Sequence, residues 1–218
     1  MKPDRLNLAT RNPDKIKEIR VILDHPQLDL VSLLDFPEMG DIVEDGDTLE
    51  ANALKKARES FQWTQIPSIA DDTGLEVAAL DGAPGVRSSR FAGEDASYRD
   101  NCEKLLRLLK GVPADKRMAR FRCVVAYTDA DEEFYVEGIC EGTILDTYRG
   151  QGGFGYDPLF YLPGIGKTFA EITTEEKNRI SHRGIAFRKM AEKLRENVFA
   201  EVKEKSNSYH TRGVAQSG

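Results

Sequence analysis

Residues 66–74 read IPSIADDTG, and this stretch decides how the middle of the chain is organised. The short apolar run 68–71 predicts one strand and the run 75–80 predicts another, with DDTG as the turn between them. Adjacent side chains of a strand point to opposite faces, so one of Asp71 and Asp72 can enter a cleft while the other braces the backbone or faces water. Two acids where a strand stops are candidate functional residues, and the alternative is that they are two solvated turn residues.

The N-terminal side of this stretch predicts alternating strands and helices. Residues 6–10 form a short apolar strand and residues 28–34 form a second, with a helix between them that begins at an N-cap signal. An acidic loop over 35–47 then leads into another helix, whose capping box is predicted at Asp47 and Glu50.

The C-terminal side predicts a helix over 97–110 and then a two-stranded hairpin. Residues 119–127 and 134–140 alternate apolar and polar around the acidic turn DADEE. A further strand is predicted over 157–162, after a glycine-rich loop, and a last helix is predicted to begin after Ser181. The class is therefore α/β with a mixed sheet.

The length, composition and net charge of the chain fit a single domain that does not bind a nucleic acid polymer. The chain has 218 residues, 40% hydrophobic and 31% charged, which suffices for one core or for two lobes sharing one sheet. We expect residues 1–202 to form a single domain and the polar, aperiodic stretch 203–218 to be disordered. The formal net charge of -6 argues against binding a nucleic acid polymer, because such proteins usually carry a basic excess.

The cysteines and the apolar runs indicate a cytoplasmic protein. Cys102, Cys123 and Cys140 are odd in number and lack zinc or redox spacing, so we expect three buried thiols. The first residues carry no apolar core of signal-peptide length, and no apolar run approaches the roughly 20 residues that span a bilayer. We therefore expect no membrane partner.

Two glycine motifs resemble phosphate-binding loops but lack the required context. GQGGFG at 150–155 matches the dinucleotide fingerprint, which works only between a strand and a helix N-terminus. Here Tyr156-Asp157-Pro158 and a strand-like run follow instead. The Gly-Lys-Thr at 166–168 lacks the glycine of a P-loop five residues earlier, where Tyr161 stands. Neither motif predicts a nucleotide site.

The turn after the first strand is a candidate anion site. Its N–H groups point along a helix N-terminus, where Asn12 and Pro13 are typical of the N-cap and the first position. Lys15 lies in the first turn, where a cation is unfavourable to the helix dipole unless an anion is bound. The alternative is an ordinary N-cap with an exposed lysine. The residues of this turn are Thr10, Arg11, Asn12, Pro13, Asp14 and Lys15.

A second helix start and an aromatic residue complete a set that suits a nucleotide. His182 and Arg183 lie where the last helix begins, and no Cys or His stands at the spacing that would make His182 a metal ligand. Phe154, flanked by glycines, can stack on a base. Because Mg²⁺ prefers one or two carboxylates plus substrate phosphates, the residues predict an Mg²⁺-dependent nucleotide site and leave the reaction open.

Four motifs resemble, in order, those of the inosine triphosphate pyrophosphatases, also called XTP/dITP diphosphatases. They are LATRNPDK, ADDTGLEVAALDGAPGVRSSRFAG, GGFGYDPLF and KTFAEITTEEKNRISHRGIAF, and the similarity extends from about Leu6 to Glu196. The resemblance implies hydrolysis of ITP, dITP or XTP to the monophosphate and pyrophosphate, which removes these deaminated purine nucleotides from the pool. It also implies a homodimer and an elongated mixed sheet flanked by helices, with an active-site cleft between two lobes.

The resemblance also implies roles for individual residues. Asp72 would be the catalytic residue that accepts a proton from water, and with Glu44 it would bind Mg²⁺. Residues 10–15 would wrap the phosphates, with Asn12 and Lys15 as the principal side chains. The other substrate contacts would be Thr73, Phe154, Gly155, Tyr156, Asp157, Lys177, His182 and Arg183.

The chain departs from the family pattern at three positions. Arg11 stands where glycine is frequent, and Thr73 stands where serine is commoner. Asp45 beside Glu44 leaves open which of the two acids contacts the metal. Two alternatives remain: a hydrolase of another nucleotide, such as a modified pyrimidine, and a non-catalytic nucleotide sensor that releases no pyrophosphate.

Overall fold

The computed structural model describes residues 5–23 and 28–197, so the stretch 203–218 that we predict to be disordered lies outside the described residues. Within the described part, α-helices flank a single sheet, and none of them is long and apolar enough to cross a bilayer. The helices are α1 (Pro13–Ile22), α2 (Leu49–Thr64), α3 (Tyr98–Leu108), α4 (Thr174–Ile180) and α5 (His182–Asn197). The strands are β1 (Arg5–Leu8), β2 (Asp29–Ser32), β3 (Ser68–Val77), β4 (Pro84–Gly85), β5 (Met118–Thr128), β6 (Glu133–Ile144), β7 (Phe160–Leu162) and β8 (Lys167–Thr168).

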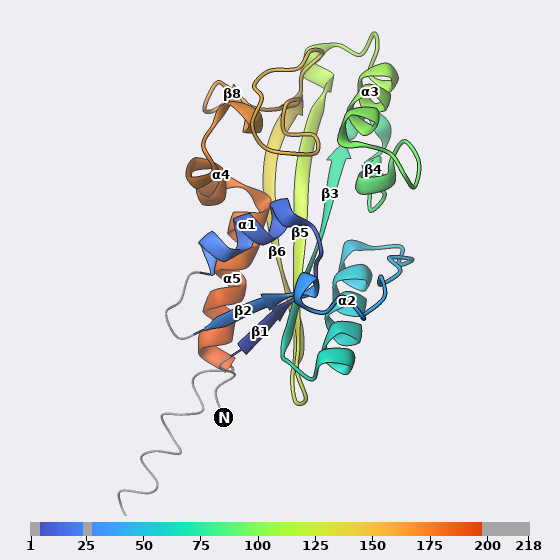
Figure 1. Cartoon of the computed structure of the whole chain (residues 1–218). Helices are drawn as coiled ribbons and strands as arrows, with labels where there is room; N and C mark the ends of the chain where they lie inside the picture. Colours follow the sequence, from blue (N-terminus) through green and yellow to red (C-terminus); the bar gives the residue numbers. More distant parts are fainter. Residues whose placement is uncertain (1–4, 24–27, 198–218) are drawn as a thin grey trace, which may run out of the picture.

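The sheet is mixed and runs in the order β2-β1-β3-β5-β6-β7-β8, with β4 paired to β3 outside that path. β1 is parallel to both of its neighbours, whereas β3, β5 and β6 pair antiparallel. Figure 1 shows these three strands running through the length of an elongated molecule. The predicted mixed α/β class and the predicted hairpin are confirmed.

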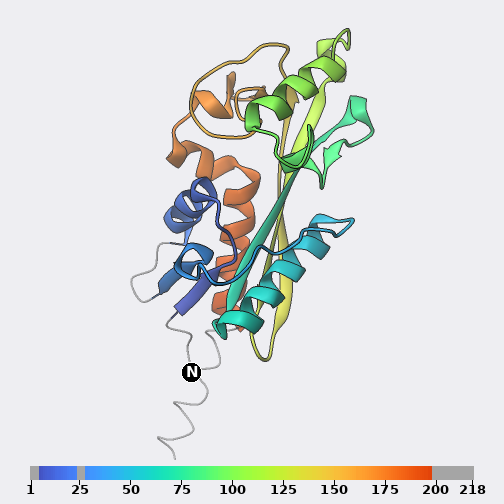
Figure 2. The ribbon, with the colours of Figure 1, turned by 45° about the vertical axis from the view of Figure 1, so that its right-hand side comes forward.

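Helices cover both faces of the long strands. α2 packs on one face, where its Ala53 belongs to the same buried cluster as Ala70 and Val124 of the sheet. α5 packs on the opposite face, where Phe187 and its neighbours meet Ile69. Figures 1 and 2 show α2 and α5 on opposite sides of the sheet. A third cluster lies at the other end of the strands and includes Leu75, Leu105, Phe121, Phe160 and Phe169.

These clusters define two lobes that share the long strands. We call the end with β1, β2, α1 and α2 the first lobe, and the end with α3, β4, β7 and β8 the second lobe; the two ends are separated along the molecule (Figure 1). The three cysteines are buried and free, as predicted. The predicted division of one sheet between two lobes therefore describes the fold.

The predicted turn at DDTG is wrong. One strand runs through Asp71 and Asp72 without a break, and every residue from 68 to 77 pairs with β5. Gly74 reflects a close approach rather than a chain reversal, because a Cβ there would lie 2.8 Å from the carbonyl oxygen of Gly85 in β4. The acidic pair therefore lies in the interior of a strand, not at its end.

Several element boundaries also differ from the prediction by a few residues, and two of these differences have a cause in a side-chain hydrogen bond. The N-cap of α2 is Thr48 rather than Asp47, and its Oγ1 accepts an amide hydrogen bond at 3.1 Å. β7 begins at Phe160, because the buried carboxylate of Asp157 accepts a hydrogen bond from the amide of Phe154 and keeps the intervening residues in a turn. Both differences shift an element without changing the order of elements.

Candidate active site

A cavity of about 400 Å³ opens between the two lobes, a size within the range of small-molecule sites. Most of the residues predicted from sequence line it, although they come from separate motifs. They are Thr10, Arg11, Asn12, Lys15, Glu44, Asp72, Thr73, Phe154, Gly155, Tyr156, Asp157, Lys177, His182 and Arg183. Pro13 and Asp14 lie at the exposed start of α1 and are not part of the lining.

Asp72 reaches the cavity from β3 on the side covered by α2. Its Oδ2 accepts a hydrogen bond from Asn52 Nδ2 at 3.0 Å, and its Oδ1 accepts one from the Thr73 amide at 2.9 Å. Burial raises the pKa of the Asp72 carboxyl; the ammonium of Lys56 opposes this shift and the carboxylate of Glu44 adds to it. A carboxyl that is fixed in place and has a raised pKa is suited to accept a proton.

The ammonium of Lys56 marks a place where a cation lies between two carboxylates. Its Nζ lies 3.0 Å from Glu44 Oε1 and 3.8 Å from Asp72 Oδ1. Within the described residues, no group of three or more His, Cys, Asp or Glu is placed to hold a metal ion. Glu44 and Asp72 thus offer two carboxylates on either side of one cation position, which suits Mg²⁺ when phosphates and water supply its other ligands. Glu44 lines the cavity, whereas Asp45 pairs with Lys55 at 2.6 Å outside it.

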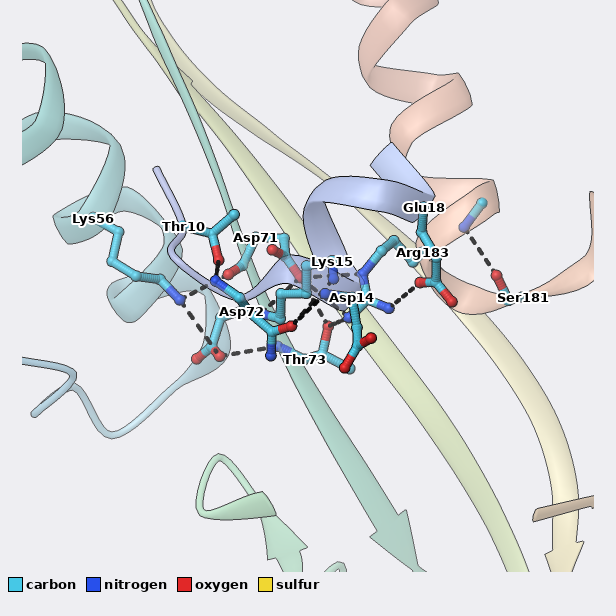
Figure 3. A network of polar contacts seen from close by, with 12 residues as sticks. Thr10, Asp14, Lys15, Glu18, Lys56, Asp71, Asp72, Thr73, Ser181 and Arg183 are labelled. Atoms are coloured by element: carbon cyan, nitrogen blue, oxygen red, sulfur yellow. Dashed lines mark hydrogen bonds and ion pairs between the residues drawn. The ribbon is translucent and has the colours of Figure 1, made fainter. Parts of the chain in front are cut away.

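Asp71 points to the opposite face of β3, and it is buried among cations rather than facing water. Its Oδ2 lies 3.0 Å from Lys15 Nζ and 3.4 Å from Arg183 Nε. Burial alone would raise the pKa of Asp71, but the charges of Lys15, Arg183 and Lys56 outweigh burial and hold it well below its ordinary value. Figure 3 shows the two aspartates between Lys56 on one side and Arg183 on the other.

The ion pairs continue through Glu18, a buried residue of α1. Glu18 Oε2 lies 2.6 Å from Arg183 Nη1, and its Oε1 lies 2.9 Å from Lys177 Nζ (Figure 3 shows the first of these pairs). Lys177 Nζ also lies 2.5 Å from Asp157 Oδ2. The cations near the helix starts are therefore balanced by internal carboxylates, so their presence does not require a bound anion. Their side chains nevertheless line the cavity.

The turn before α1 is capped by its own side chain. Asn12 Oδ1 accepts hydrogen bonds from the amides of Asp14 at 2.9 Å and Lys15 at 3.2 Å, two of the groups predicted to bind an anion. Asn12 Nδ2 donates to the hydroxyl of Tyr98, which belongs to the second lobe, at 3.1 Å. Burial alone would lower the pKa of Lys15, but the carboxylate of Asp71 raises it. The turn therefore presents a charged ammonium to the cavity.

His182 begins α5 and packs its ring on Phe121, with centroids 4.5 Å apart and planes 18° apart. Gly138 of β6 permits this approach, because a Cβ there would clash with the His182 carbonyl oxygen. Burial lowers the pKa of His182 well below 6.5, and the charges of Arg183 and Lys177 add to the shift. The imidazole is therefore neutral at pH 7, and the cation at this helix start is Arg183.

The buried neutral imidazole predicts that acid destabilises the fold. Below about pH 6.5 the unfolded chain binds a proton at His182 that the folded chain does not, so stability falls as the pH falls. We expect this residue to lower the free energy of unfolding by up to about 1.4 kcal/mol per pH unit. We expect the free energy of unfolding, measured by chemical denaturation, to fall less steeply between about pH 7 and pH 5 in His182→Gln than in wild type. Equal slopes in the two proteins would contradict the assignment of a neutral imidazole.

The glycine-rich loop folds around the carboxylate of Asp157. The Phe154 amide donates to Asp157 Oδ2 at 2.9 Å. The Phe154 ring lies 4.7 Å from Lys177 Nζ and 5.8 Å from the ring of Tyr98. Tyr156 is buried, and its hydroxyl donates to a backbone carbonyl at 2.9 Å. The loop therefore supplies an aromatic wall, which agrees with rejecting the dinucleotide fingerprint.

Four polar residues at or beside the cavity carry no motif of their own. Asn52 and Lys56 lie one turn apart on the buried face of α2, and polar residues that interrupt such an apolar stripe are a usable signal. Glu18 lies one turn beyond Lys15 on α1 and is buried. Tyr98 opens α3, and nothing in its local sequence marks it.

Comparisons with known proteins find relatives over most of the chain. The model of the Ham1 family matches residues 6–193. A protein from Desulforamulus reducens named dITP/XTP pyrophosphatase is 50% identical over 191 residues, covering 87% of this chain and 95% of that protein. One of the same name from Geobacter sulfurreducens is 50% identical over 183 residues, covering 84% and 92%. A solved HAM1 protein from Coxiella burnetii is 38% identical, with a TM-score of 0.80 over 88% of this chain and 98% of that one.

Proposed function

The chain belongs to the Ham1 family, and we propose that it hydrolyses dITP, XTP and ITP to the nucleoside monophosphate and pyrophosphate, with Mg²⁺ as its cofactor. Relatives that are 50% identical carry the name dITP/XTP pyrophosphatase, so the chain is a nucleoside triphosphate pyrophosphatase. The observation that carries the proposal is that one cavity brings Asp72, Lys15 and Arg183 together from three separate motifs.

The proposed chemistry is attack of water on a phosphorus atom, the α-phosphorus of the triphosphate. The bond from the water oxygen to phosphorus forms, the bond to the pyrophosphate oxygen breaks, and Asp72 takes the water proton. Lys15 and Lys177 line the cavity and are placed to stabilise charge on the phosphate oxygens. Mg²⁺ held by Asp72 and Glu44 would neutralise phosphate charge and make the water more acidic.

The charge of the cavity wall supports selection of a 6-oxo purine. Hypoxanthine and xanthine present an acceptor at that position, whereas adenine presents an amino donor. Arg183 has donors and no acceptor, so an adenine placed against it would set donor against donor. A site that demands a particular hydrogen-bond partner discriminates by about 10⁴-fold or more.

Pyrophosphate release from ITP, XTP, dITP, ATP, GTP and dTTP, measured with and without Mg²⁺, tests the proposal. We expect rapid release from the three deaminated nucleotides only when Mg²⁺ is present. Preference for dTTP would assign the site to a pyrimidine, and binding of inosine nucleotides without release would indicate a sensor. Equal rates with and without Mg²⁺ would remove the metal from the proposal.

Replacing Phe154 with alanine should raise KM more than it changes kcat, because the base would lose its stacking surface. Stacking on an aromatic side chain is worth about 1–3 kcal/mol per base, so we expect KM for dITP to rise about tenfold. Tyr135→Ala removes an exposed aromatic side chain far from the cavity lining and is the control. An unchanged KM in Phe154→Ala would place the base elsewhere.

A further inference from the structure

Arg11 follows β1 in the turn, and its guanidinium is surrounded by the segment 33–41. Nη1 donates to the Leu33 carbonyl oxygen at 2.8 Å, and Nη2 donates to those of Phe36, at 3.3 Å, and Met39. Nε lies 3.4 Å from Asp41 Oδ1. Arg11 is thus committed to backbone carbonyls of one segment, although sequence alone suggests a phosphate contact.

The shape of the guanidinium fits this arrangement. Its five N–H donors form a planar fork, so one side chain can reach several carbonyl oxygens that face a common point. The segment makes two consecutive turns that direct these carbonyls: the amide of Phe36 donates to the Leu33 oxygen at 3.3 Å, and the amide of Met39 donates to the Phe36 oxygen at 3.2 Å. Lysine has the charge but not the fork, so it cannot make the same set of contacts.

The same segment leads directly to Glu44. Asp41 and Glu44 both line the cavity, and the carbonyl oxygen of Glu44 accepts a hydrogen bond from Arg90 Nη2 at 3.0 Å. Its carboxylate lies 3.0 Å from Lys56 Nζ. Residues 33–44 are therefore fixed by Arg11 at the first lobe and by Arg90 next to the acid itself.

We propose that Arg11 is a positioning residue that holds segment 33–41 and thereby keeps Glu44 at the cavity wall opposite Asp72. The inference rests on the proposed function, because Glu44 matters there as a ligand of Mg²⁺. Without the fork, the segment samples conformations that withdraw the carboxylate. The apparent affinity for the metal falls in proportion to the fraction of molecules that keep the binding conformation.

Arg11→Lys and Arg11→Gly test the proposal, with Arg20→Lys as the matched control. Arg20 also donates to a backbone carbonyl, that of Leu30 at 3.3 Å, but it is exposed and outside the cavity lining. The first readout is hydrogen–deuterium exchange of residues 33–45 in metal-free protein, without substrate. The second is the half-saturating Mg²⁺ concentration for pyrophosphate release from dITP, measured alongside KM at saturating Mg²⁺.

We expect both Arg11 variants to exchange faster in residues 33–45 and to need about tenfold more Mg²⁺, with a much smaller change in KM. Added guanidinium ion at low concentration should restore Arg11→Gly towards wild type and leave Arg11→Lys unchanged. A rise in KM with an unchanged Mg²⁺ requirement and unchanged exchange would overturn the proposal and make Arg11 a substrate contact. Wild-type protein that releases no pyrophosphate would instead sink the proposed function, and the exchange result would still decide whether Arg11 holds the segment.

Discussion

Replacing Asp72 with asparagine is expected to lower kcat for dITP by about a thousandfold or more, within the range that a general base contributes. The amide has nearly the shape of the carboxyl, but it does not accept a proton at neutral pH. It is also a poorer ligand for Mg²⁺ than a carboxylate. One substitution therefore removes both proposed roles of Asp72.

The fold should survive Asp72→Asn because the substitution removes a charge from a place where burial opposes charge. The raised pKa of Asp72 shows that opposition. The new side chain can still accept the hydrogen bond from Asn52 through its oxygen. The contact with the Thr73 amide then sets donor against donor. The unpaired donor lowers the free energy of unfolding by about 1–3 kcal/mol, which is less than the roughly 5–15 kcal/mol of a typical domain.

Pyrophosphate release by the purified variant at saturating Mg²⁺ measures the effect, and circular dichroism with a thermal melt checks the fold. Asp131→Asn, an exposed aspartate in the turn between β5 and β6, makes the same chemical change far from the cavity and should keep full activity. Turnover of Asp72→Asn at the wild-type rate would remove Asp72 from the mechanism.

Patterns that are local in the chain predict local structure here. The hairpin of β5 and β6 follows from alternation on each side of one turn, and its register joins residues close in sequence. The N-cap at Asn12 follows from two adjacent residues, and the side chain bonds the amides that an N-cap should bond. Such features depend on interactions between residues that are close in the sequence.

The acidic pair shows why the rest could not be predicted. DDTG has the composition of a turn, but pairing of the whole stretch with β5, a strand some fifty residues later, imposes extended backbone. Two adjacent carboxylates can be buried in a strand only if cations reach both faces. Those cations come from α1, α2 and α5, and the contact of Arg183 with Asp71 spans 112 residues. Strand alternation predicts that Asp71 and Asp72 point to opposite faces, whereas only the fold shows which cations meet each of them.

Asp71→Asn should therefore destabilise the protein more than the same change one residue later. The neutral side chain leaves Lys15 without the carboxylate 3.0 Å from its ammonium and leaves Arg183 with Glu18. Removing one partner from a buried ion pair typically lowers the free energy of unfolding by about 3–5 kcal/mol, because the remaining charges stay buried. We expect a loss of this size at pH 7.

Urea denaturation of wild type, Asp71→Asn and Asp72→Asn tests this prediction. Asp72→Asn is the matched control from the same strand. The pH dependence gives a second check. The folded pKa of Asp71 lies well below its ordinary value of 3.8, so its stabilisation is complete above that pH and is lost as the pH falls below it. The stability difference between wild type and Asp71→Asn should therefore shrink in acid. If Asp71→Asn proved as stable as wild type at pH 7, the cations around Asp71 would not be holding the strand, and the division of roles between the two aspartates would fail.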